Sequence, residues 1–163
     1  MIFKVRHGGI EDPHNVHDTT TVTGTAAIEL EAGVVVKITG SEKVGPVTGS
    51  DVPYGFLLQR VKTEYANLPA GFRFRGDLGS SDAFVGDPVG VFVSGGIADT
   101  DSFDADLTGA MAYGANLYAK AGGKLTDDVS LSVNGANPVA VAKNSLTADA
   151  ISNSKFLRIK SLL

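Results

Sequence analysis

The chain has 163 residues and a mass of 16.8 kDa, enough for one domain with a substantial hydrophobic core. Lys and Arg number 14 and Asp and Glu number 18, so the net charge is 14 − 18 = −4, which argues against nucleic acid or an anionic membrane as a partner. There is no cysteine, which excludes disulfides, cysteine-ligated zinc and thiol catalysis. The 20 Gly and six Pro predict a folded chain with many turns.

The first 25 residues differ from the rest. Five threonines fall between Thr19 and Thr25, and all three histidines of the chain lie in this segment. Threonine favours extended backbone, but little here is apolar enough to be buried, so residues 1–25 are predicted to form an extended arm that orders on a partner. Residues 26–163 are predicted to form the folded domain. The arm residues expected to contact a partner are Phe3, Val5, His7, Val16, Thr20 and Val22.

Short apolar segments alternate with turn residues from Ala26 onward, which is typical of β-strands. The Gly122-Gly123 pair between two such segments predicts a hairpin. Helix patterns are weak, and only residues 146–151 could form one or two turns. The strands are expected at residues 28–31, 34–39, 54–63, 72–75, 88–94, 115–120, 124–126, 138–142 and 156–163.

These segments amount to about eight to ten short strands, the spacing expected of an all-β fold. The predicted architecture is a small β-barrel or β-sandwich of short antiparallel strands with an extended N-terminal arm. The last strand alternates apolar with basic residues, which predicts an edge strand protected by lysine. No apolar run approaches the ~20 residues of a membrane-spanning helix. The start of the chain has no apolar stretch of signal-peptide length, so either the protein is intracellular at synthesis or a leader has been removed, and the initiating Met1 favours the first.

The motifs of several enzyme classes are missing. No serine has the glycine spacing of a nucleophile elbow, and there is neither a phosphate-binding loop nor a dinucleotide-binding glycine pattern. Outside the arm there is no histidine, so a catalytic site would rest on carboxylates such as Asp87 and Asp99. We therefore expect no enzymatic activity, no catalytic residues and no cofactor, with a carboxylate-dependent hydrolase as a minor alternative.

Two clusters could in principle bind metals. His14 and His17, flanked by Asp12 and Asp18, could ligate zinc or nickel if the backbone turned there, but a solvated arm is the favoured interpretation. Asp99-Thr100-Asp101 and Asp104-Ala105-Asp106 have the charge of a calcium loop. They lack the glycine that an EF-hand needs at its sixth position, where Asp104 stands, so a polar loop is expected instead.

Basic and aromatic residues suggest possible binding surfaces. Arg73 and Arg75 share one face of a predicted strand, which could be a basic face for an acidic partner or simply the solvent side of the strand; the second interpretation is favoured. The same alternatives hold for Lys155, Arg158 and Lys160. A sugar-binding platform could be built from aromatic rings, but core or interface packing is the favoured role. The tyrosines concerned are Tyr54, Tyr65, Tyr113 and Tyr118.

Residues 32–163 resemble the small all-β capsid decoration, or cement, proteins of tailed bacteriophages. The resemblance rests on the order of several short motifs along the chain. These are Ala32-Gly33-Val34-Val35-Val36-Lys37-Ile38, Pro53-Tyr54-Gly55-Phe56-Leu57, Gly86-Asp87-Pro88-Val89-Gly90-Val91, Tyr113-Gly114-Ala115-Asn116-Leu117-Tyr118-Ala119, Gly122-Gly123-Lys124-Leu125-Thr126, Pro138-Val139-Ala140-Val141-Ala142 and Leu157-Arg158-Ile159-Lys160.

The resemblance implies a non-enzymatic virion protein on the outer capsid surface. It implies binding to the major capsid protein and self-association as a homotrimer, or alternatively a dimer, with no direct contact to nucleic acid or membrane. Such a protein reinforces the shell by linking adjacent subunits. An alternative function of a different class is a β-sandwich module for carbohydrate binding or host adhesion. In that case the tyrosines would form the binding surface.

Overall fold

The computed structural model describes residues 3–7, 10–16, 30–40, 43–62, 82–84, 88–103, 111–147 and 156–163. The fold is nearly all β, which confirms the predicted class. The strands are β1 (Phe3–His7), β2 (Ile10–Val16), β3 (Val35–Gly40), β4 (Lys43–Pro46), β5 (Gly55–Leu57), β6 (Arg60–Lys62), β7 (Asp82–Phe84), β8 (Pro88–Ser94), β9 (Ile97–Thr100), β10 (Asn116–Ala119), β11 (Leu125–Thr126), β12 (Ala140–Ala142) and β13 (Leu157–Ser161).

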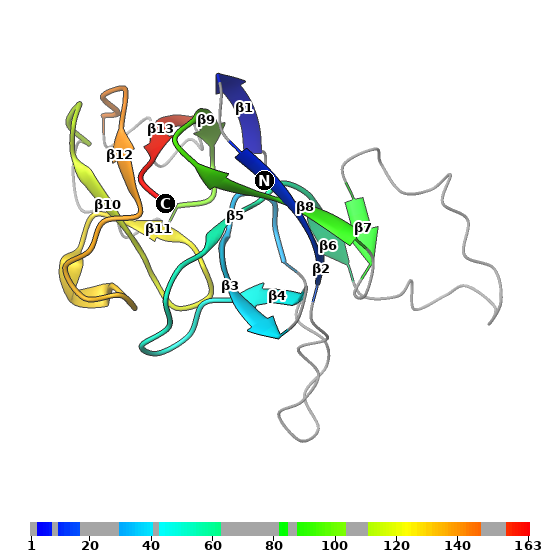
Figure 1. Cartoon of the computed structure of the whole chain (residues 1–163). Coiled ribbons are helices and arrows are strands. Elements are labelled where there is room, and N and C mark those ends of the chain that lie inside the picture. The colour runs from blue at the N-terminus through cyan, green and yellow to red at the C-terminus, as the bar shows by residue number, and fades with distance from the viewer. Residues whose placement is uncertain are drawn as a thin grey trace, which may run out of the picture.

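Two sheets make up the body of the protein (Figure 1). One is a closed ring in the order β2-β4-β3-β5-β8, which a short parallel pairing of β2 with β4 completes. The other is an antiparallel six-stranded sheet in the order β1-β9-β13-β12-β10-β11. A separate parallel pair of β6 and β7 lies beside the barrel. The predicted barrel or sandwich thus takes the form of a barrel joined to an open sheet.

The apolar triplet Val34-Val35-Val36 contributes side chains to both hydrophobic clusters of the body. Val34 and Val36 belong to the barrel core, whereas Val35 belongs to the cluster between the barrel and the six-stranded sheet. Successive side chains of a strand point to opposite faces, so a strand buried on both faces needs an uninterrupted apolar run. The triplet therefore sits where barrel and sheet meet.

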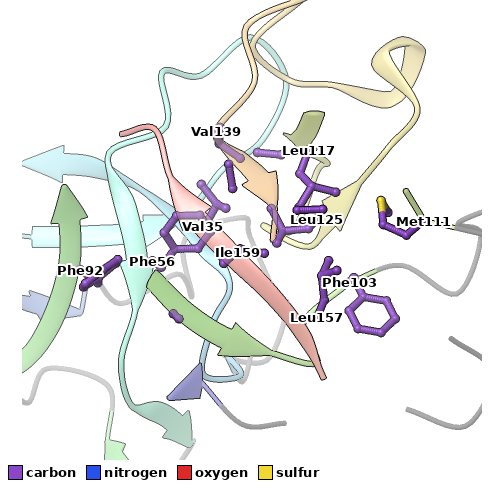
Figure 2. Packing of buried hydrophobic residues seen from close by; sticks show 14 of the residues in the cluster. Val35, Phe56, Phe92, Phe103, Met111, Leu117, Leu125, Val139, Leu157 and Ile159 are labelled. Carbon is purple, nitrogen blue, oxygen red and sulfur yellow. The ribbon is translucent and has the colours of Figure 1, made fainter. Parts of the chain in front are cut away.

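The larger hydrophobic cluster fills the space between barrel and sheet (Figure 2). Phe56 of β5 and Phe92 of β8 reach it from the barrel, and both are fully buried. From the six-stranded sheet it receives, among others, Leu117, Leu157 and Ile159, which are also fully buried. Because one continuous cluster includes residues of both sheets, the barrel and the sheet are packed into a single unit.

The predicted hairpin is present between β10 and β11, and it also ties the sheet to the barrel. Gly122 and Gly123 have φ angles of +88° and +83°, which glycine adopts readily. The Val35 amide donates to the Gly123 carbonyl at 2.7 Å, and the Gly122 amide donates to the Val47 carbonyl at 2.9 Å. A Cβ atom on Gly123 would overlap the backbone oxygen of Val35. The glycine at 123 is therefore needed for close docking as well as for the turn.

The described part of the N-terminal segment, residues 3–7 and 10–16, is extended, as predicted, but it is built into the body. β1 pairs with β9 along the edge of the six-stranded sheet, and β2 pairs with β8 and β4 in the barrel. The expected separation of an arm from the domain therefore does not apply to residues 3–7 and 10–16. Residues 17–25 lie outside the described residues.

The expectation that the final strand forms an edge was wrong. β13 lies inside the six-stranded sheet, between β9 and β12, with antiparallel partners on both sides. Arg158 and Lys160 are on the solvent-exposed face of the sheet and do not protect an edge. A short 3-10 helix at Val129–Leu131 was not expected; Asp128 caps it by accepting a hydrogen bond from the Ser130 amide at 2.8 Å.

Other expected elements are only partly described. Leu146 and Thr147, at the start of the expected helix, are not helical, and Leu146 forms an isolated bridge with Met111. Residues 28–29, 72–75 and 148–151 lie outside the described residues.

Candidate functional site

The outward face of the six-stranded sheet gathers basic side chains. Along β13, Leu157 and Ile159 are buried while Arg158 and Lys160 are exposed. Other strands of the sheet bring further cations to this face: Lys143 follows β12, which pairs with β13, and Arg6 lies on β1, which β9 separates from β13. We call this surface the basic face; its four cations among the described side chains are Arg6, Lys143, Arg158 and Lys160.

Asp99 of β9 holds two of these cations in place. Its Oδ1 accepts a hydrogen bond from Nε of Arg158 at 2.8 Å, and its Oδ2 accepts from Nη2 of Arg158 at 3.3 Å. Oδ2 also accepts from Nε of Arg6 at 2.7 Å. The Asp99 side chain is only 9% exposed, whereas those of Arg6 and Arg158 are 44% and 49% exposed. The two guanidinium groups are therefore anchored at one end and open to solvent at the other.

The electrostatics of this cluster follow from its geometry. Hydrogen bonds from Arg158 and Arg6 lower the pKa of the Asp99 carboxyl below its usual value, against the opposing effect of burial. The same carboxylate raises the pKa of the Arg158 guanidinium. Asp99 is thus held as a carboxylate with its oxygens occupied, an arrangement suited to positioning arginines and unsuited to donating a proton.

Aromatic side chains border the basic face. Lys143 donates to the Tyr113 hydroxyl at 2.8 Å, and its Nζ lies 4.9 Å from the centre of the Tyr113 ring. Tyr113 is 62% exposed and Phe156, next to the start of β13, is 45% exposed. Asn144 joins these groups, since it donates to the Phe156 carbonyl at 3.3 Å and accepts from the Arg158 amide at 2.7 Å. Exposed rings and cations therefore lie together at one end of β12 and β13.

The charge of the basic face is opposite to that of the chain. Its four cations are accompanied by Asp99 and by Asp101, which directly follows β9, so the face carries 4 − 2 = +2. The whole chain carries −4, whereas the described residues outside this face balance, with seven cations and seven anions, 7 − 7 = 0. A positive sheet face on an acidic protein is an asymmetry that net charge conceals.

The structure distributes the residues expected to contact a partner as follows. Phe3 is half-buried in the chain's own core, where its ring stacks on Phe56 with the centroids 5.6 Å apart and meets Phe92 edge-on at 5.8 Å. Val5 and His7 stand opposite Ala98 and Ile97 in the β1–β9 ladder. Val16 stands opposite Val44 in the barrel. Thr20 and Val22 lie outside the described residues.

The expectation of a polar loop over residues 99–106 was wrong for its first two residues. Asp99 and Thr100 belong to β9 and are buried, and Asp99 binds arginines. His14 lies in the extended strand β2, opposite Val89, while His17 is outside the described residues. Among the described residues, no group of three or more acidic or histidine side chains could hold a metal ion.

The remaining candidate residues are only partly described. Tyr54 packs against the barrel core, as the core-packing interpretation predicts, and Tyr118 is half-exposed on β10. Arg73, Arg75, Lys155, Asp87 and Tyr65 lie outside the described residues.

Sequence reasoning considered Arg158 and Lys160 but missed Arg6, Lys143 and the central role of Asp99. Asp99 and Arg158 are 59 positions apart, and Asp99 and Arg6 are 93 apart. Only the strand register, which pairs Asp99 directly with Arg158, brings them together.

Comparison with known proteins gives no relative from which to transfer a function. No protein-family model matches the sequence, and no curated protein matches it significantly. Within the described residues, no helix has the length and apolar character needed to cross a bilayer.

Proposed function

We propose that this chain is a structural virion protein that binds the outer surface of a tailed-bacteriophage capsid and stabilises contacts between major capsid protein subunits. The observation that carries the proposal is the ordered series of motifs between residues 32 and 163 that resembles capsid decoration proteins. In the structure these motifs supply β3, β5, β8, β10, β11, β12 and β13, which belong to both parts of the body.

The packing of the body is in keeping with this role. A protein that reinforces a shell has to transmit force between the subunits that it touches, which requires a rigid connection between its own parts. Here the barrel and the six-stranded sheet share one hydrophobic cluster, and the Gly122-Gly123 turn links them by main-chain hydrogen bonds. Many copies on a symmetric shell would then add avidity to individually modest contacts. The proposed form is a homotrimer, with a dimer as the alternative.

The decisive experiment is to purify virus particles produced by the source of this gene and to measure the ratio of this chain to the major capsid protein. A fixed ratio that survives washing at high salt, and labelling of the chain on the outside of intact particles, would support the proposal. Absence of the chain from the particles would contradict it. Binding to a glycan array without any particle association would favour the adhesion module instead.

Removal of residues 1–25 would not be a clean test of attachment. The deletion takes away β1 and β2, which pair with β9 in the sheet and with β8 and β4 in the barrel. Loss of binding by such a variant could reflect loss of the fold. Substitutions on a solvent-exposed face avoid this ambiguity.

A further inference from the structure

We propose that the basic face of the six-stranded sheet is a docking surface for an acidic region of another protein. The identity of that partner rests on the proposed function, according to which the acidic region belongs to the capsid shell. Arg6, Arg158 and Lys160 are exposed on one side of the sheet, and Lys143 joins them from the end of β12. The inference rests on the charge, the anchoring and the aromatic border of this face.

Charge complementarity identifies the partner as acidic. The face carries +2 while the other described residues balance to zero, so within the described part of the protein an acidic partner is attracted to this face. Such an arrangement selects one orientation during encounter, which is the main contribution of complementary charge at protein interfaces.

Anchoring by Asp99 prepares two arginines for binding. A free arginine side chain loses conformational freedom when it is immobilised at an interface, and this loss opposes association. Arg6 and Arg158 are already held through Nε by the buried carboxylate, while about half of each side chain remains exposed. Their outward nitrogens are therefore positioned to donate to carboxylates of a partner.

The aromatic border favours a protein over a nucleic acid. Tyr113 and Phe156 are exposed next to Lys143 and Arg158, and tyrosine, phenylalanine and arginine are enriched in protein–protein interfaces. A long polyanion that extended beyond the basic face would find no further excess of positive charge among the described residues. A compact acidic patch that includes some apolar area matches the face better.

A pair of charge reversals tests this without disturbing the anchor. Lys143→Glu combined with Lys160→Glu leaves Asp99, Arg6 and Arg158 unchanged. The matched control is Lys43→Glu with Lys124→Glu, which alters the net charge equally at exposed positions on β4 and in the β10–β11 turn. Binding to DNA-free expanded shells is measured by co-sedimentation at low and physiological ionic strength. We expect the test pair to weaken binding at least about tenfold and the control pair to change it less than about twofold.

A second assay separates failure of this inference from failure of the proposed function. A labelled polyglutamate peptide and an oligothymidylate of equal charge are titrated with the full chain and followed by fluorescence anisotropy. We expect the peptide to bind the wild-type chain and the control pair, and to bind the test pair at least about tenfold more weakly. We expect the oligothymidylate to bind the wild-type chain at least about tenfold more weakly than the peptide does. If the wild-type chain ignores shells but binds the peptide in this pattern, the proposed function fails and the acidic-partner inference stands.

Three results would overturn the inference. One is equal binding of shells and peptide by the test and control pairs. Another is preference of the wild-type chain for the oligothymidylate, which would assign the face to nucleic acid. The third is self-association that depends on protein concentration and disappears in the test pair, which would assign the face to a second copy of this chain.

Discussion

Asp99 and Arg158 stand directly opposite each other on β9 and β13 and form a two-point contact, with nitrogen–oxygen distances of 2.8 and 3.3 Å. Arg6 of the edge strand completes the cluster from the other side of β9. One buried carboxylate therefore connects three adjacent strands. These strands come from the beginning, the middle and the end of the sequence, so the cluster fastens both ends of the chain to the body.

The first prediction concerns removal of this carboxylate. Asp99→Asn keeps the size of the side chain but leaves two guanidinium groups without their counter-charge. We expect the free energy of unfolding at neutral pH to fall by about 2 kcal/mol, the scale of hydrogen bonds to a charged group that is largely buried. Denaturant unfolding measures this change. Asp127→Asn, at an exposed position, is the control and should change stability by less than about 0.5 kcal/mol; equal effects of the two substitutions would contradict the assigned role of Asp99.

The second prediction concerns the pH dependence of that stabilisation. The pKa of Asp99 is lowered in the folded protein, so its ionised form contributes stability above the unfolded-state pKa of about 3.9. This contribution is lost as the pH falls through the lowered folded-state value. The stability difference between the wild-type chain and Asp99→Asn should therefore be largest at neutral pH and shrink below about pH 4. A difference that stays constant down to strongly acidic pH would show that the carboxylate charge is not responsible.

The local pattern of the sequence predicted much of the fold. The run Val34-Val35-Val36 indicated a strand; Val35 and Val36 begin β3, and the three side chains lie in the two hydrophobic clusters. The glycine pair at 122–123 indicated a hairpin and has the positive φ angles that such a turn requires. These predictions succeed because the backbone and burial preferences concerned lie within a few neighbouring residues.

The neighbours of each strand could not be predicted in the same way. Alternation along residues 157–161 correctly separates buried from exposed side chains, but it does not reveal whether the strand lies at an edge or inside the sheet. That depends on pairing with β9 and β12, which are distant in the sequence. The basic face depends on the same pairing. The sequence alone therefore pointed to Arg158 and Lys160 but did not show that Asp99 binds both Arg158 and Arg6.

The N-terminal segment illustrates a second limit. Its composition suggested an arm, because threonine, histidine and glycine provide little apolar surface. Phe3 nevertheless provides an anchor, since its ring fits against Phe56 and Phe92. One aromatic side chain together with backbone pairing can hold a short strand in place even when the average composition is polar.

The third prediction tests that anchor. Phe3→Ala removes a half-buried ring from the junction of barrel and sheet, and we expect a loss of roughly 2 kcal/mol, below the range for fully buried phenylalanines. Phe156→Ala is the matched control, because Phe156 is 45% exposed and should cost less than about 0.5 kcal/mol. Thermal and denaturant unfolding report both changes. If the two substitutions cost the same, Phe3 does not anchor β1.

The fourth prediction separates turn strain from crowding at the hairpin. Gly122 and Gly123 both have positive φ angles, so an alanine at either position costs about 1–2 kcal/mol of backbone strain. A Cβ atom at 122 meets no other atom within 4 Å, whereas one at 123 would overlap the Val35 carbonyl oxygen. We therefore expect Gly123→Ala to destabilise the protein by at least about 1 kcal/mol more than Gly122→Ala.

The Val35 amide should also exchange its hydrogen faster in Gly123→Ala, because that amide donates to the Gly123 carbonyl. Equal stability losses with unchanged exchange at Val35 would mean that the turn does not dock against β3 as closely as the structure indicates.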